Sequence, residues 1–205
     1  MKNNHTWVIC AYGESEFLEA CILSLQAQTL PSKIICYSST PLDSIKQLCQ
    51  KYGVPFYTKE GGGIGKDWNN ALSFVETAYT TIAHQDDYYE PTYLEAVMQK
   101  IEQSKDILIA YTDYFEEKNG VKIPANTNLK IKTLMLKTLN LMPASRFWRN
   151  RVLAFGNPIS CPAVTYNLEA LSDFQFDEEM RVSLDWYAWY KISAYKGRFA
   201  YISEK

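Results

Sequence analysis

Apolar and polar residues follow two different patterns along the first ninety residues of the chain. Short apolar runs, which predict buried strands, occur at residues 6–11, 33–37, 55–57 and 80–84. The segments between them repeat apolar residues every three or four positions, as a helix with one buried face requires, at residues 14–28, 42–52 and 66–78. This alternation predicts an α/β fold: a central, mostly parallel sheet with right-handed crossovers and helices on both faces.

After Pro91 the alternation of strand and helix patterns becomes less regular, but the sequence still predicts helices and strands. Asn119-Gly120 is typical of a hairpin turn, and residues 128–151 are mostly helical in pattern. The remaining predicted elements are helices at 92–103 and 184–196 and strands at 106–111, 163–166 and 198–202. No repeat, low-complexity tract or linker interrupts the pattern, so we predict a single domain over residues 1–205.

The predicted strands end in polar or glycine-bearing segments. These are Ala11-Tyr12-Gly13, Tyr37-Ser38-Ser39, the glycine loop 61–65 and His84-Gln85-Asp86-Asp87. Ligands of parallel α/β sheets bind beyond the carboxyl ends of the strands. We therefore expect the four segments to meet at one crevice.

The two adjacent aspartates of the last segment are the sharpest chemical feature. Carboxylate oxygens are the ligands that Mg²⁺ and Mn²⁺ prefer, and such a cation can neutralise a departing diphosphate. Taken alone, Asp86 and Asp87 are better explained as caps of the helix that starts near Pro91. Both interpretations stay open at this point.

Four motifs in order resemble family 2 glycosyltransferases, which have the Rossmann-like GT-A fold. They are Val8-Ile9-Cys10-Ala11-Tyr12-Gly13-Glu14 with Leu23-Ser24-Leu25-Gln26-Ala27-Gln28-Thr29, then Asp67-Trp68-Asn69-Asn70-Ala71-Leu72, His84-Gln85-Asp86-Asp87 and Leu184-Asp185-Trp186. The third falls where the family carries its Asp-x-Asp motif, and the fourth where it carries its base motif. The resemblance implies a nucleotide-sugar-binding half at 1–112 and an acceptor-binding half at 113–205.

The resemblance also implies a donor site that binds a nucleoside-diphosphate sugar, with a UDP-sugar as the expected donor. Asp86 would hold Mn²⁺ or Mg²⁺, and Asp87 would contact the ribose or support the metal. The full set of implied donor-site residues is Ala11, Tyr12, Glu14, Ser38, Asp67, Asn69, His84, Asp86 and Asp87. Ser38 and His84 stand where the family usually has aspartates, so they are departures from its pattern.

Asp185 is the implied catalytic base, which would take the proton of the acceptor hydroxyl in an inverting transfer. A carboxylate that caps the helix starting near residue 184 is the alternative interpretation. The stiff segment 156–162 and the aromatic helix after Asp185 are expected to line the acceptor side, through Asn157, Ser160 and Trp186. The chain ends soon after this motif, whereas relatives usually continue, so we expect a C-terminally truncated domain.

Composition and charge limit the classes of partner that we expect the protein to bind. The net charge of −2 and the pI near 5.8 give no overall basic field, which argues against nucleic acid. No signal peptide or run of about 18 apolar residues is present, so we expect a cytoplasmic protein. The basic residues at 146–151 could form a solvated helix face, or contact an acidic acceptor or the inner face of the membrane. Five cysteines without a C-x-x-C pair predict buried reduced thiols.

Together these features predict a metal-dependent hexosyl transfer to a saccharide or lipid-linked acceptor, in the synthesis of a cell-surface polysaccharide. A sugar-nucleotide-binding module without activity is the alternative, motivated by His84, Ser38 and the short C-terminus. A nucleotidyltransferase would share the sheet pattern. It would normally carry a basic, glycine-rich segment after the first strand, where this chain has Glu14.

Overall fold

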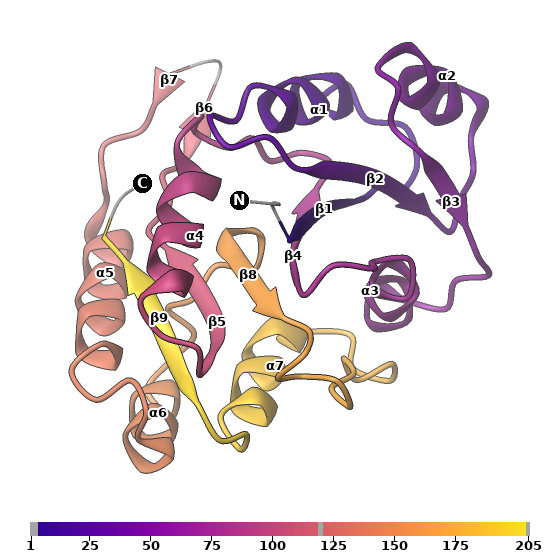
Figure 1. Ribbon diagram of the computed structural model, residues 1–205. Coiled ribbons are helices and arrows are strands. Elements are labelled where there is room, and N and C mark those ends of the chain that lie inside the picture. The colour runs from indigo at the N-terminus through magenta and orange to yellow at the C-terminus, as the bar shows by residue number, and fades with distance from the viewer. Residues whose placement is uncertain (1–3, 119–120, 204–205) are drawn as a thin grey trace.

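The computed structural model describes residues 4–118 and 121–203, which form a seven-stranded sheet covered by helices on both faces (Figure 1). The strand order is β3-β2-β1-β4-β8-β5-β9, and β8 is antiparallel to both of its neighbours. The strands are β1 His5–Cys10, β2 Lys33–Ser38, β3 Phe56–Thr58, β4 Tyr79–His84, β5 Ile107–Thr112, β8 Val164–Asn167 and β9 Arg198–Ile202. The predicted α/β class with a mostly parallel sheet is confirmed.

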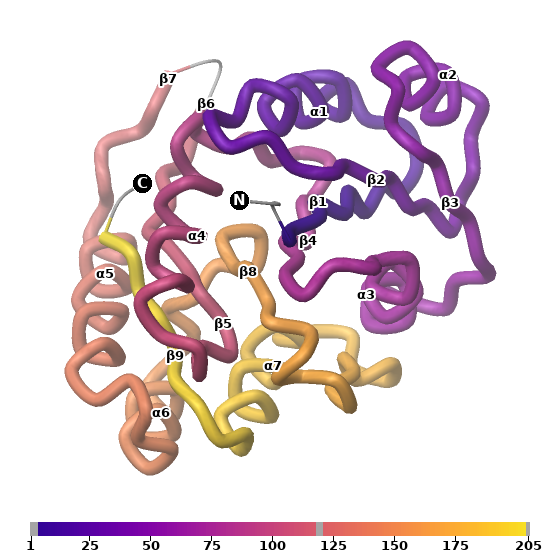
Figure 2. Tube along the Cα trace, viewed as in Figure 1, coloured from indigo at the N-terminus to yellow at the C-terminus, as the bar shows by residue number. Residues whose placement is uncertain are grey.

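Alternation along the strands divides the core into two parts. In β1, Val8 faces one part, whereas Trp7 and Ile9 face the other. Helices α1 Leu18–Gln26, α2 Asp43–Lys51 and α4 Tyr93–Glu102 pack on the Trp7 side. The opposite side is covered by α3 Ile64–Leu72, α5 Thr127–Leu139, α6 Arg146–Leu153 and α7 Leu184–Ile192. The continuous trace in Figure 2 shows α5 and α6 beside β9, at the end of the sheet away from β3.

Several predicted helices differ in extent from those observed. The helix expected at 14–28 covers only Leu18–Gln26, since residues 14–17 form the approach from β1. The helix expected at 66–78 begins two residues earlier and ends at Leu72. The helical stretch 128–151 is two helices, because the segment with Pro143 separates α5 from α6 and proline cannot continue a helix.

The hairpin expected at residues 119–120 has its turn outside the described residues. The strands that flank it, β6 Glu117–Lys118 and β7 Val121–Lys122, do pair antiparallel. A short 3₁₀ turn, η1 Cys161–Ala163, leads into β8. All five cysteines are unpaired, as expected, and four of them are buried. Within the described residues, no helix is both long and apolar enough to cross a bilayer.

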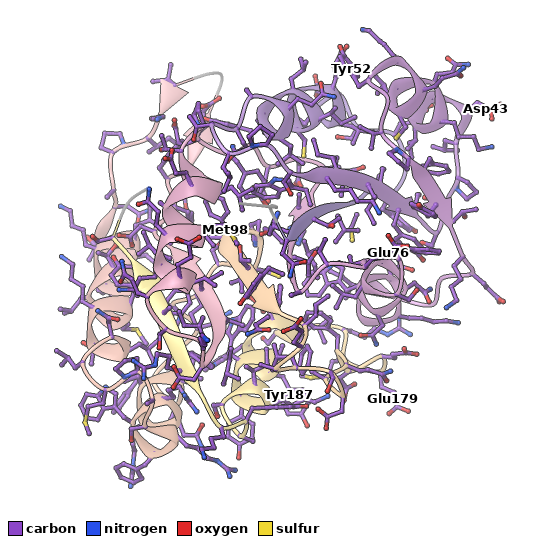
Figure 3. All side chains as sticks on the ribbon, in the orientation of Figure 1. Asp43, Tyr52, Glu76, Met98, Glu179 and Tyr187 are labelled. Carbon is purple, nitrogen blue, oxygen red and sulfur yellow. The ribbon has the colours of Figure 1, made fainter. Side chains whose placement is uncertain are left out.

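Register brings the ends of the three central parallel strands together. Cys10, the last residue of β1, is paired with His84 at the end of β4 and with Tyr37 near the end of β2. On the outer side, α1 and α2 are tied by Tyr52, which is labelled in Figure 3 and donates a hydrogen bond to Glu19 over 2.5 Å. The polar segments after β1, β2 and β4 therefore start from one edge of the sheet, as the sequence predicted.

Candidate functional site

The loop after β4 gathers three groups that can bind a metal. The His84 imidazole and the Asp86 and Asp87 carboxylates each offer a ligand atom, and these atoms lie within 4.8 Å of one another. Helix α4 starts later, at Tyr93 with Thr92 as its N-cap, and takes no side-chain cap. The interpretation of the two aspartates as caps of that helix is therefore wrong.

Burial shifts the pKa values of two side chains in this loop. It raises the pKa of Asp87 to about 6, and the negative charge of Asp86 acts in the same direction. Burial also lowers the pKa of His84, against the opposing charges of Asp86 and Asp185. The His84 ring stacks on Trp68 with 5.5 Å between centroids, and its Nε2 has no hydrogen-bond partner among the described residues. The lowered pKa favours the neutral imidazole, whose Nδ1 lies 3.6 Å from an Asp87 carboxylate oxygen.

Gln85, which the sequence did not single out, fixes the first strand end to this loop. Its amide accepts a hydrogen bond from the backbone N–H of Tyr12 at 3.1 Å and donates one to the Tyr12 carbonyl at 2.8 Å. The backbone of Tyr12 is thereby held while its side chain stays 67% exposed. An exposed, anchored aromatic ring suits a flat ligand such as a nucleobase.

A cavity of about 750 Å³ opens beside these residues, at the carboxyl ends of β1, β2 and β4. Asp67 on α3 lies in its wall, where it accepts hydrogen bonds from Ser39 at 3.0 Å and Tyr37 at 3.3 Å. Gly61 packs against Ser39 and Asp67 so closely that a Cβ would lie 2.6 Å from the Cβ of Ser39. The other lining residues are Cys10, Ala11, Tyr12, Thr40, Gly62, Gly63, Ile64, Trp68, His84, Gln85, Asp86 and Arg181.

A second cavity, of about 320 Å³, adjoins the first at Asp86, which lines both. Asp87 and Ser160 lie in its wall, and Tyr88, Tyr114 and Phe115 give it aromatic surfaces. Further acids face it, including Glu90, Asp113, Glu116 and Glu117. We call the two the larger cavity and the smaller cavity below.

Asp185 lies in the first turn of α7 and is held by Asn157. The Asn157 amide donates a hydrogen bond to an Asp185 carboxylate oxygen over 2.7 Å. Ser183 occupies the N-cap position, in a left-handed conformation with φ of 54°, so the interpretation of Asp185 as the N-cap is wrong. Asn157 was predicted to bind the acceptor directly, but its nearest polar contact is this carboxylate.

The comparison with known proteins decides the family. The sequence profile described as "Glycosyl transferase family 2" matches residues 6–160, which is most of the chain. The chain belongs to glycosyl transferase family 2. A curated protein, glycosyltransferase GlyA of Streptococcus pneumoniae serotype 4, is 24% identical over 123 residues, which cover 57% of this chain and 18% of GlyA.

Solved structures confirm the GT-A fold of this family 2 chain. Residues 1–349 of S. aureus TarS superpose with a TM-score of 0.75 at 20% identity, over 98% of this chain and 58% of that one. Mannosyltransferase PcManGT from Pyrobaculum calidifontis, in complex with GDP-Man and Mn²⁺, gives a TM-score of 0.72 at 12% identity, over 98% and 55%. The chain thus spans less than two thirds of these proteins.

Three residues that the sequence assigned to the donor site of this family 2 chain lie elsewhere. Ser38 is fully buried in β2, and its neighbour Ser39 faces the larger cavity instead. The Asn69 amide is taken up by the backbone of Phe176, at 3.0 and 2.8 Å, and so ties α3 to the loop before α7. Glu14 is exposed beside α1 and α2, outside the larger cavity.

One acceptor-side prediction also changes place. Trp186 donates its indole N–H to the Leu153 carbonyl at 2.9 Å and lines a separate, apolar hollow of about 330 Å³ between α6 and α7. Conversely, Arg181 from the loop before α7 lines the larger cavity and was not singled out. No spacing rule could have found Arg181, since the loop places it there through contacts with α3 that are distant in sequence.

Proposed function

We propose that the protein transfers a sugar, with inversion, from a UDP-sugar to a saccharide or lipid-linked acceptor in cell-surface polysaccharide synthesis. The observation that carries the proposal is the position of Asp86, which faces both cavities. Transfer requires the departing diphosphate and the incoming hydroxyl to meet at one sugar carbon. A carboxylate at the junction of a larger and a smaller cavity stands where those two partners would meet.

The larger cavity supplies groups that suit a nucleoside diphosphate. Tyr12 offers an aromatic surface for the base, and Asp67 offers carboxylate oxygens to base or ribose donors. Glycines 61–63 leave room for close approach, and Arg181 is the cation in the wall that could pair with phosphate. Solved relatives of this fold are bound to UDP, UDP-GlcNAc or GDP-Man, which supports the donor class.

The residues of the β4 loop fit a divalent cation. Asp86 and Asp87 offer oxygen ligands, and His84 offers a ring nitrogen, with its Nδ1 3.6 Å from an Asp87 carboxylate oxygen. Mn²⁺ accepts a nitrogen ligand more readily than Mg²⁺ does. A bound cation would supply charge neutralisation for the leaving diphosphate. Related structures contain Mn²⁺ with GDP-Man, or Mg²⁺ with UDP in glucosyl-3-phosphoglycerate synthase from Mycobacterium tuberculosis.

Asp185 is proposed as the base that takes the proton of the acceptor hydroxyl. The negative charge of Asp185 opposes the lowering of the His84 pKa, which is consistent with a position near the metal loop. The hydrogen bond from Asn157 orients one carboxylate oxygen and leaves the other for the acceptor. Asn157 is then a positioning residue. Ser160, in the wall of the smaller cavity, remains the proposed contact to acceptor hydroxyls.

Calorimetry and a transfer assay test this proposal. We expect UDP and UDP-sugars to bind more tightly with Mn²⁺ than with a chelator, and Asp185→Asn to abolish transfer while donor affinity stays within about twofold. Asp43→Asn is the matched control, because it makes the same change on the exposed side of α2. Normal turnover by Asp185→Asn would refute the base assignment. Donor binding by the unmodified protein without transfer or donor hydrolysis would instead favour the inactive binding module.

A further inference from the structure

Charge is distributed very unevenly along the chain. Residues 118–168 contain eight lysines and arginines and no aspartate or glutamate. The rest of the chain has the other 13 basic residues and all 23 acidic ones. A net charge of −2 therefore combines a segment of +8 with a remainder of −10. Within the segment Arg149 is buried and Lys122 pairs with Glu90, whereas Lys130, Lys137, Arg146 and Arg151 are exposed, and such exposed cations favour an anionic partner.

Helix α5 presents a mixed apolar and cationic stripe to solvent. Lys130, Leu134, Lys137 and Leu141 follow one another at spacings of four, three and four residues, which places them along one side of the helix and its final turn. Leu134 and Leu141 are 64% and 72% exposed. The opposite side of α5 is buried through Leu129, Leu136 and Leu139. The exposed leucines are thus additional to the face that α5 needs for packing.

Helix α6 packs against α5 and carries further exposed basic and apolar side chains. Phe147 is 67% exposed, and the Arg151 guanidinium lies 5.0 Å from the centre of its ring. The Trp148 indole donates a hydrogen bond to the Thr138 carbonyl over 2.7 Å, which fixes α6 to the end of α5. Arg146 is also exposed. We call the set Lys130, Leu134, Lys137, Leu141, Arg146, Phe147 and Arg151 the basic-apolar surface.

Acidic residues of the smaller cavity, Asp113, Glu116 and Glu117, lie next to α5, and other acids lie farther from the basic-apolar surface. Asp43, Glu76 and Glu179, labelled in Figure 3, lie toward α2, α3 and the loop before α7, away from α5 and α6. The basic-apolar surface lies at the β9 end of the sheet, far from these three acids (Figure 2).

We infer that the basic-apolar surface docks the protein on an anionic lipid bilayer. Lysines and arginines are attracted to anionic headgroups, and leucine and phenylalanine side chains between them can enter the acyl boundary. A nucleic acid would match the charge but would leave the exposed leucines without an apolar partner. The combination of both side-chain classes on one helix face favours lipid.

Helix α5 also contacts the smaller cavity, through residues on a different side of the helix from the exposed stripe. Thr133 of α5 donates a hydrogen bond to Asp113 over 3.0 Å, and Lys132 donates one to Tyr114 over 3.0 Å. Asp113 and Tyr114 both line the smaller cavity. Helix α5 thus lies between the docked face and the smaller cavity, and the docking itself does not rest on the proposed function.

Vesicle flotation with the full chain tests the docking. We expect binding to vesicles of phosphatidylcholine with 40% phosphatidylglycerol, and no binding to pure phosphatidylcholine. Each basic residue near such a surface contributes about fivefold to binding, so Lys130→Gln with Lys137→Gln should weaken it about 25-fold. Leu134→Ser should weaken it roughly tenfold through the loss of buried apolar area.

Matched controls carry the same changes on the far side of the sheet. Lys46→Gln with Lys51→Gln removes two charges from α2, and Leu23→Ser removes an exposed leucine from α1; both should bind as the unmodified protein does. Circular dichroism melts verify that each variant folds. Equal binding to both vesicle types, no binding to either, or unchanged binding of the α5 variants would overturn the proposal. So would displacement of the vesicles by a 20-base-pair DNA duplex, or a dimer that the α5 variants dissociate.

Donor binding separates this inference from the proposed function. Calorimetry with UDP and Mn²⁺ on the α5 variants should give unchanged affinity, because none of the substituted residues lines the larger cavity. Loss of vesicle binding with intact donor binding supports docking alone. Failure of donor binding in the unmodified protein would refute the proposed function and leave the docking result standing.

Discussion

His5 offers a quantitative test of how the core of this family 2 domain is built. The side chain is fully buried, with Nδ1 2.9 Å from the Ser32 hydroxyl and Nε2 2.9 Å from the Thr81 hydroxyl. Ser32 donates its own hydrogen to the His5 carbonyl at 2.6 Å, so it accepts from Nδ1–H. Thr81 then donates to Nε2 and is 2.6 Å from Thr165. Both ring nitrogens are satisfied in the neutral form.

Protonation of His5 is opposed by burial, which lowers its pKa from 6.5 to about 3. The unfolded chain takes up this proton below about pH 6.5, whereas the folded protein does not until about pH 3. The unfolded state therefore binds more protons in this window, and the free energy of unfolding falls as the pH falls. For these two pKa values the loss between pH 7 and pH 5 is about 2 kcal/mol. That corresponds to roughly 4–8 °C in Tm for a chain of this size.

Urea unfolding of the unmodified protein and of His5→Asn at pH 7 and pH 5 measures this contribution. We expect His5→Asn to be less stable at both pH values, because Thr81 loses its acceptor. Its loss between pH 7 and pH 5 should nevertheless be about 2 kcal/mol smaller. The comparison is between variants because the raised pKa of Asp87 acts in the opposite direction, stabilising the folded state as the pH falls. His84→Asn should change the pH dependence in the same direction, because burial lowers the pKa of that imidazole as well. Identical pH dependence with and without His5 would refute the reasoning.

Two further predictions concern Gly65, in the first turn of α3, and Asn157, in the loop after α6. Gly65→Ala should lower stability by about 1–3 kcal/mol in urea unfolding, because its Cβ would lie 2.1 Å from the backbone oxygen of Asp177. Gly62→Ala meets only the flexible Lys66 side chain and should change stability little; equal effects would contradict the packing argument. Asn157→Leu should lower kcat about 10- to 100-fold with KM for the donor nearly unchanged, since it removes a charge-assisted hydrogen bond to Asp185. If Asn157→Gln retains activity and Asn157→Asp does not, the result supports a role of Asn157 in positioning Asp185. A change in KM without a change in kcat would contradict that role.

Local pattern was sufficient for the sheet but not for the ends of its helices. The apolar runs at 6–11 and 80–84 predicted β1 and β4 almost to the residue, because strands buried on both faces need continuous apolar sequence. Helix α3 was misplaced by several residues. Its first turn is set by Gly65, which packs against the backbone of Asp177, more than a hundred residues away. Periodicity within a window contains no information about such a contact.

Site residues at strand ends could be predicted from the sequence, whereas those placed by long-range contacts could not. Tyr12, Asp67 and Asp86 were found because they stand at the ends of strands or at the start of a helix that faces the crevice. Arg181 was missed because its loop folds back onto α3. Asn69 was misjudged because the same loop takes up its amide. The side-chain amide of Gln85 looked interchangeable with any loop residue, and only the structure shows that it holds both polar backbone groups of Tyr12.

His84 reduces the negative charge of the proposed metal loop. Where the family pattern has an acid, this chain has an imidazole whose pKa is lowered by burial, so it stays neutral at pH 7. Asp86 and Asp87 then provide the negative charge alone. Because burial raises the pKa of Asp87 to about 6, that carboxylate becomes protonated at lower pH and its negative charge is lost. Fewer fixed charges mean weaker attraction for a free cation. On the proposed function, we therefore expect the cation to bind mainly together with the diphosphate, whose own charges complete the site, and to bind the donor-free protein weakly.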